Sequence, residues 1–264
     1  MKVVKLGGSV ITNKRAAGSR KGSKARFAPM LARRLLKEIR DSKQEVILVT
    51  GAGSFGHVLA DRYGLKSGYR EDRQWDGFVE VSRDVRRLNL LVLDEAVRLG
   101  MRPISIPPSV SVLQCDGNIH YIDEGVFRRY LAHGIMPLTF GDVALDMGER
   151  RFSICGGDAL VLRLSQLVGA ERAVFVTDVD GIRVGEQGAL AAEFGPGDLG
   201  RITPLKGAGG KDVTGGMAAK ARLSVELSAS GTETVILNGK RRGRLLDALR
   251  GGHPRGTWFR RPVA

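Results

Sequence analysis

The chain has few cysteines and no long apolar run. Its two cysteines, Cys115 and Cys155, are far apart in the 264 residues, which indicates neither a disulfide framework nor a zinc site. Charged residues interrupt every apolar run before the ~20 residues that a membrane helix needs, and the N-terminus lacks a charged-then-apolar leader. These absences predict a soluble cytoplasmic protein with no membrane partner.

Aromatic residues are also scarce, at 6% of the chain, whereas basic residues are abundant. Forty-two basic residues against 28 acidic ones give a net charge of +14, which suits either nucleic acid or anionic small molecules. The basic residues gather between Lys14 and Arg26 and in "GKRRGR", residues 239–244. Neither cluster interleaves aromatic side chains for base stacking. We predict no nucleic-acid partner, and plain surface charge accounts for most of these residues as well as a binding role does.

Segments typical of strands alternate along the chain with segments typical of helices. The strand-like segments are 2–6, 45–50, 102–106, 134–140, 171–178 and 232–238. The helix-like segments are 26–41, about 74–99, one ending near His133 and one beginning near Thr214. This alternation predicts an α/β fold with a largely parallel central sheet sandwiched by helices. Segments 116–123 and 143–154 are predicted to form small β-hairpins.

Two glycine turns follow the first two predicted strands. In "KLGGS", Gly7 and Gly8 allow backbone N–H groups to approach an anion, and Lys5 supplies a positive charge, although such a turn is also a common strand exit. In "GAGSFGH", His57 is expected in the first turn of a helix. There it can donate a hydrogen bond to a phosphate oxygen, or it can be a partly buried residue that ties the loop down.

Three further segments place charged residues beside glycines or turns. In "GGDAL", Asp158 is either a helix N-cap or a buried carboxylate that orients lysines. In "TDVDGI", Asp178 and Asp180 either hold magnesium or belong to a turn. In "TGGMAAK", Lys220 lies one helical turn beyond Gly216 and faces whatever the glycines approach. Oriented amides and lysines of this kind are what phosphoryl transfer requires.

In this order and spacing, "KLGGSVITNK", "GAGSFGH", "GGDAL", "TDVDGI" and "TGGMAAK" resemble the amino acid kinase superfamily over nearly the whole chain. The second lysine of the first motif and the histidine of "GSFGH" are most similar to the isopentenyl phosphate kinases. The resemblance implies one amino acid kinase domain over 1–264, with an acceptor half at 1–170 and a nucleotide half at 171–264. It also implies a homodimer that transfers phosphate from ATP, with Mg²⁺, to isopentenyl phosphate.

The resemblance also implies roles for individual residues. Its catalytic residues are Lys5, Lys14, His57, Asp158 and Lys220, with no protein-held metal. Its ATP-binding residues are Lys5, Leu6, Gly7, Gly8, Ser9, Gly53, Asp178, Gly181, Gly216 and Lys220. Its acceptor-binding residues are Ala52, Gly53, His57 and Gly157 at the phosphate, and Phe78, Val79, Ser82 and Val85 at the prenyl tail.

The sequence departs from this pattern in three places. Ala52 stands where the family usually has glycine, "ICGGD" leaves open whether Gly156 or Gly157 contacts the acceptor, and the basic segment 15–26 is long. Three alternatives stay open: a fosfomycin-type kinase, which shares the histidine-bearing loop, a non-catalytic nucleotide sensor, and an RNA-binding protein. The apolar residues of the long helix favour a prenyl acceptor over fosfomycin.

Overall fold

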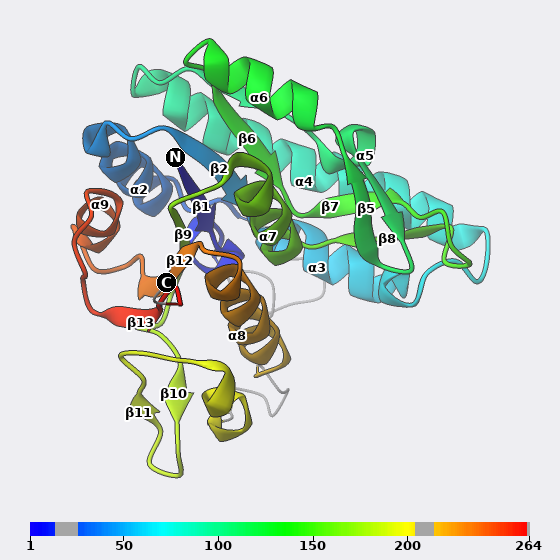
Figure 1. The fold of residues 1–264 in the computed structure, drawn as a ribbon. Helices are drawn as coiled ribbons and strands as arrows, with labels where there is room; N and C mark the ends of the chain where they lie inside the picture. The colour runs from blue at the N-terminus through cyan, green and yellow to red at the C-terminus, as the bar shows by residue number, and fades with distance from the viewer. Residues whose placement is uncertain (14–25, 204–213, 263–264) are drawn as a thin grey trace.

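A seven-stranded sheet forms the centre of the molecule (Figure 1). The structure is a computed structural model and describes residues 1–13, 26–203 and 214–262. In spatial order, the strands are β13 (Gly256–Phe259), β12 (Glu233–Asn238), β9 (Arg172–Thr177), β1 (Lys2–Leu6), β2 (Val46–Thr50), β6 (Met136–Phe140) and β3 (Pro103–Ser105). All neighbours pair in parallel except β12 and β13, which are antiparallel. The predicted largely parallel sheet is therefore confirmed.

Helices cover both faces of this sheet because successive strand residues point to opposite sides. Val4 and Leu6 of β1 face one core, which is closed by α2 (Pro29–Ser42), α4 (Arg73–Arg98) and α9 (Arg244–Leu249). Val3 of β1 and Phe175 of β9 face the other core, which is closed by α6 (Glu124–Ala132), α7 (Gly157–Val168) and α8 (Thr214–Ala229). The sandwich of sheet and helices is the predicted α/β arrangement.

Several short elements connect the layers. They are α1 (Gly8–Ile11), α3 (Gly53–Arg62), α5 (Pro108–Ser111) and the 3₁₀ helices η2 (Leu65–Ser67) and η3 (Pro196–Arg201). The hairpins are β4 (Val112–Cys115) with β5 (Asn118–Ile122), β7 (Asp142–Leu145) with β8 (Phe152–Cys155), and β10 (Arg183–Val184) with β11 (Ala189–Leu190). The β7–β8 hairpin matches the prediction for 143–154. The β4–β5 hairpin begins at Val112, before the predicted segment 116–123, because its first strand precedes the turn, and the β10–β11 hairpin was not predicted.

The parallel strands direct all their carboxyl ends to one edge of the sheet. The segments after β1, β2, β6, β9 and β12 therefore lie beside one another, although they are far apart in sequence. In open parallel sheets, ligands bind outside the carboxyl ends of the strands.

None of the helices formed by the described residues is both long and apolar enough to cross a membrane.

Candidate active site

A cavity of about 570 Å³ lies at the carboxyl edge of the sheet. Its wall includes residues from each of the motifs singled out in the sequence: Lys5, Gly7, Gly8, Ser9, Gly51, Ala52, Gly56, His57, Gly156, Gly157, Asp158, Asp178, Gly216 and Lys220. The fold thus brings five separate sequence segments to one site.

The two glycine turns after β1 and β2 touch each other through Gly8, which lines the cavity, and Gly53, which is not among its lining residues. A Cβ atom on Gly8 would lie 2.4 Å from the Cα atom of Gly53, and Gly53 itself has a φ of +51°. Thr12 joins the turns, because its hydroxyl donates to the Gly8 carbonyl (2.7 Å) and accepts from the Ser54 N–H (3.3 Å). Larger residues at Gly8 or Gly53 would force the turns apart, so the glycines make this close approach possible.

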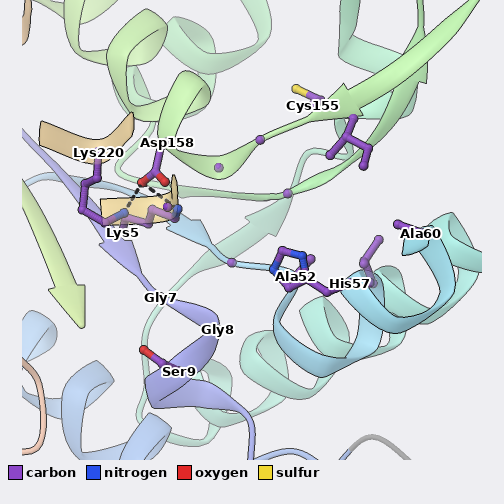
Figure 2. A pocket seen from close by; sticks show the side chains of 18 of the residues that line it. Lys5, Gly7, Gly8, Ser9, Ala52, His57, Ala60, Cys155, Asp158 and Lys220 are labelled. Atoms are coloured by element: carbon purple, nitrogen blue, oxygen red, sulfur yellow. Dashed lines mark hydrogen bonds and ion pairs between the residues drawn. The ribbon is translucent and has the colours of Figure 1, made fainter. Parts of the chain in front are cut away.

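Two lysines converge on one carboxylate at one end of the cavity (Figure 2). The Nζ atoms of Lys5, from β1, and Lys220, from α8, lie 2.7 Å and 2.6 Å from the same Asp158 oxygen. The Lys220 Nζ atom also lies 4.9 Å from the centre of the Phe175 ring. Asp158 is in the first turn of α7, but its side chain makes no N-cap hydrogen bond. Of the two roles considered for Asp158, the structure therefore shows the carboxylate that holds lysines.

Burial and charge set the ionisation of this cluster. Burial and, next, the nearby Lys220 charge lower the pKa of Lys5 to about 8, while the charge and hydrogen bond of Asp158 act in the opposite direction. Burial alone would raise the pKa of Asp158, but the charges and hydrogen bonds of the two lysines lower it to about 2. The carboxylate is therefore ionised at neutral pH, and two positive charges are held close together beside the cavity. Such a pair favours an anion that can enter between the lysines and the glycine turns.

His57 lies at another part of the cavity wall, on α3 (Figure 2). It is the fifth residue of α3, so the expected position in the first turn is wrong: the helix begins at Gly53 and His57 falls in its second turn. The side chain is exposed rather than partly buried. The helix places Ala60 on the same wall, one turn beyond His57.

Beyond His57 the cavity wall is apolar. Ala60, Val81, Val85, Val143 and Ile154 come from α3, α4, β7 and β8 and line this end. They belong to a small core cluster that also contains Phe152. Sequence reasoning did not identify Val81, Val143 or Ile154. A valine pair at i and i+4 on the long helix was the only local signal for Val81.

The four residues proposed for the prenyl tail are placed differently from one another. Val85 lines the cavity, whereas Phe78, Val79 and Ser82 are not among its lining residues. The Phe78 ring packs on Trp75 and Phe152, with centroids 5.5 Å and 5.7 Å away. Val79 is 65% exposed on the outer side of α4. Val81 and Val85 form the stripe of α4 that reaches the cavity.

The remaining predicted site residues take varied positions. Leu6 has a fully buried side chain, and its carbonyl accepts a hydrogen bond from the Gly51 N–H. Gly181 lies outside the cavity lining, where an added Cβ would lie 2.3 Å from the Thr257 hydroxyl. Asp180 accepts hydrogen bonds from Asn238 (3.0 Å) and Arg244 (2.8 Å). Lys14 and the basic segment 15–25 lie outside the described residues.

The carboxylates at the site do not make a magnesium cage. Among the described residues, no three His, Cys, Asp or Glu side chains are grouped to hold a metal. Asp158 is engaged by two lysines, and Asp178 lies 3.9 Å from the Lys240 Nζ atom. Magnesium commonly binds through substrate phosphates with few protein carboxylates. A magnesium ion would therefore fit this site as part of a metal–nucleotide complex.

Comparison with known proteins defines the class. The family model described as "Amino acid kinase family" matches residues 1–238, so the chain belongs to that family. The amino acid kinase fold expected from the sequence is confirmed.

Individual relatives narrow the class. The isopentenyl phosphate kinase of Methanothermobacter thermautotrophicus is 35% identical over 97% of this chain and 98% of its own length. That of Thermoplasma acidophilum is 38% identical over 69% of each chain. X-ray structures of isopentenyl phosphate kinase match with a TM-score of 0.84 and 30% identity, over 98% of this chain and 99% of the other. Within the amino acid kinases, the chain thus belongs to the isopentenyl phosphate kinase family.

Proposed function

We propose that the protein transfers the γ-phosphoryl group of ATP to isopentenyl phosphate, giving isopentenyl diphosphate and ADP. Relatives covering nearly the whole chain carry this activity in their names, and a matching structure, with a TM-score of 0.76, is described as a substrate complex. The observation that carries the proposal is the two-ended cavity. It has two lysines at one end and a histidine beside an apolar wall at the other.

The lysine end suits the transferred phosphoryl group. A phosphate oxygen of the acceptor attacks the γ-phosphorus, the bond to the β-phosphate oxygen breaks, and ADP leaves with that electron pair. The protein does little covalent work in such a reaction and acts by positioning and by stabilising charge. Lys5 and Lys220 would stabilise the negative charge on the transferred group, while the backbone N–H groups of Gly8, Gly53 and Gly216 would hold the phosphates.

Asp158 acts through the lysines. Because both Nζ atoms lie within 2.7 Å of one of its oxygens, the carboxylate fixes their positions before the nucleotide arrives. In the proposal, Lys14 adds a third positive charge, and Asp178 and Gly181 contribute to nucleotide binding. Mg²⁺ would enter with ATP and neutralise part of the phosphate charge.

His57 and the apolar wall suit the acceptor. A histidine can donate a hydrogen bond to a phosphate oxygen, which a kinase for a carboxylate acceptor would not require. Ala52 and Gly157 would place backbone N–H groups around the same phosphate. The prenyl tail would then lie against Val81, Val85, Val143 and Ile154, where burial of its methyl and methylene groups favours binding. Phe78, Val79 and Ser82 would influence this pocket only through the position of α4.

The proposal also covers the organisation of the whole protein. Residues 1–170 would bind the acceptor and residues 171–264 the nucleotide. The protein would act as a homodimer in the cytoplasm. Size-exclusion chromatography with light scattering tests the dimer, because a mass of one chain would contradict it.

The decisive experiment measures ADP release with Mg–ATP and a panel of acceptors. The panel contains isopentenyl phosphate, dimethylallyl phosphate, geranyl phosphate, fosfomycin, UMP and acetylglutamate. Selective turnover of isopentenyl phosphate is the expected result. Turnover of fosfomycin alone, or ATP binding with no turnover of any acceptor, would refute the proposal.

A further inference from the structure

The loop between β12 and α9 presents three consecutive cations. Lys240, Arg241 and Arg242, called the basic rim here, are all exposed. Lys240 has a distant acidic neighbour, since its Nζ atom lies 3.9 Å from an Asp178 oxygen. Within the described part of the chain, Arg241 and Arg242 make no ion pair with an acidic side chain. Among the described residues, acidic side chains therefore leave most of the positive charge of the basic rim unpaired.

A buried network fixes the backbone of this loop. The Asn238 side chain donates to Asp180 (3.0 Å) and accepts from the Lys240 N–H (2.9 Å). At the other end of the loop, Glu38 of α2 accepts from the N–H groups of Gly243 (3.1 Å) and Leu246 (3.2 Å). Glu38 is itself buried. These hydrogen bonds hold the backbone on both sides of the basic rim, so its exposed cations project from a fixed segment. Cations that served only as plain surface charge would not require a fixed backbone.

The loop borders the nucleotide side of the cavity. The Gly239 N–H donates to the carbonyl of Thr177 (2.8 Å), a residue of the cavity wall. An added Cβ on Gly239 would lie 3.4 Å from a methyl group of Val10, which belongs to the helix of the first glycine turn. The basic rim is therefore continuous with the part of the site that contains Asp178 and Lys5.

The order of the strands determines how far the basic rim lies from each part of the cavity. The basic rim follows β12, Asp178 follows β9, Lys5 lies on β1, and His57 follows β2. With neighbouring strands about 4.8 Å apart, β1 is roughly 10 Å from β12, and β2 is roughly 14 Å away. Charges are screened over about 8 Å at physiological ionic strength. The basic rim should then act more strongly at the nucleotide end than at the His57 end.

From these observations we infer that the basic rim captures the triphosphate of ATP by electrostatic attraction and guides it into the cavity. Fixed positive charge beside a cleft raises the association rate of anions and does so less as salt increases. The triphosphate carries more negative charge than the single phosphate of the acceptor, so the association rate of the nucleotide should increase more than that of the acceptor. The inference rests on the proposed function only for the identity of the nucleotide.

The test compares two double variants that lose equal charge. Arg241→Gln/Arg242→Gln removes two charges from the basic rim and leaves Lys240 in place. Arg102→Gln/Arg129→Gln removes two exposed charges elsewhere, at the start of β3 and on α6. Stopped-flow fluorescence measures the association rate of Mg-bound N-methylanthraniloyl-ATP without acceptor. Steady-state assays measure kcat and kcat/KM for ATP and for isopentenyl phosphate.

The expected result is specific to one variant and one substrate. At ~0.15 M ionic strength, the rim variant should bind the nucleotide roughly fivefold more slowly, and the difference should disappear near ~1 M. Its kcat and its kcat/KM for isopentenyl phosphate should be unchanged, and the control variant should match the wild type. Equal rates for the two variants, a loss that persists at high salt, or an equal loss for isopentenyl phosphate would overturn the inference. Normal nucleotide association with no turnover of isopentenyl phosphate would instead refute the proposed function.

Discussion

The lysine end and the apolar end of the cavity are built by different means. At the lysine end, Lys5, Asp158 and Lys220 are locked together by contacts of 2.6 to 2.7 Å. At the apolar end, Val81, Val143 and Ile154 are held only by packing within their core cluster. Directional charge contacts fix geometry, as catalysis requires, whereas apolar packing can change shape at small cost. The comparison predicts large effects on rate at one end and small effects on acceptor choice at the other.

The largest effect is expected from Lys5→Met. Loss of a cation that stabilises the transferred group should lower kcat roughly 100- to 1000-fold. The matched control is Lys2→Met, because Lys2 lies on the same strand, is 7% exposed against 8% for Lys5, and pairs with Glu171 at the opposite edge. Steady-state assays with saturating ATP and isopentenyl phosphate measure both. A kcat for Lys5→Met within a fewfold of Lys2→Met would contradict the catalytic role of Lys5.

A smaller and more selective effect is expected from His57→Ala. A hydrogen bond to a charged group contributes about 1.5–3 kcal/mol, so kcat/KM for the acceptor should fall roughly 10- to 100-fold. The KM for ATP should stay the same, because the lysine end is intact. His133→Ala, at the exposed end of α6, is the control. An equal change in both KM values would remove His57 from the acceptor site.

The pH dependence tests the lysine cluster as a unit. With a pKa of about 8, Lys5 is protonated below that pH and loses its charge above it, so kcat/KM should fall as the pH rises through about 8. Bound ATP should stabilise the positive charge of Lys5, so the fall of kcat in the pH profile, its alkaline limb, should begin at a higher pH than the fall of kcat/KM. The limb should fall about tenfold per pH unit once the lysine is neutral.

Asp158→Asn sharpens the same prediction. The Asp158 charge and hydrogen bond raise the pKa of Lys5, so their loss should lower that pKa and move the limb to more acidic pH. Asp142→Asn is the control, because Asp142 also lines the cavity but does not contact either lysine in the described interactions. A profile for Asp158→Asn that coincides with the wild type would show that another group limits the rate.

The smallest effect is expected from Val81→Ala. Removing two methyl groups from the apolar wall makes room for a longer tail. The ratio of kcat/KM for geranyl phosphate to kcat/KM for isopentenyl phosphate should therefore rise by roughly fivefold, which is less than the 10-fold or more that one methylene can cause in a tight pocket. Val79→Ala, on the exposed side of the same helix, should leave the ratio unchanged. If Val79→Ala changed the ratio and Val81→Ala did not, the acceptor would have to lie elsewhere.

The two ends also differ in how well the sequence predicted them. Lys5, Asp158 and Lys220 stand within or next to glycine turns, and such turns restrict the local backbone strongly enough to be recognised in sequence. The apolar wall has no comparable signal. Phe78 and Val79 were proposed for it because they lie on the right helix, but the rotation of α4 against its neighbours brings Val81 and Val85 to the cavity. A helical pattern predicts which residues share a face, not which neighbour that face meets.

The amino-acid sequence by itself determined the alternation of strands and helices, the parallel sheet, the glycine turns and the charged residues beside them. These features depend on residues close together in the chain, where backbone sterics and side-chain periodicity act. Only the tertiary structure decided that Lys5 and Lys220 share one oxygen of Asp158, which residues form the apolar wall, and that Lys240 lies near Asp178 of the cavity wall. Such juxtapositions arise from packing between distant segments, which no local pattern specifies.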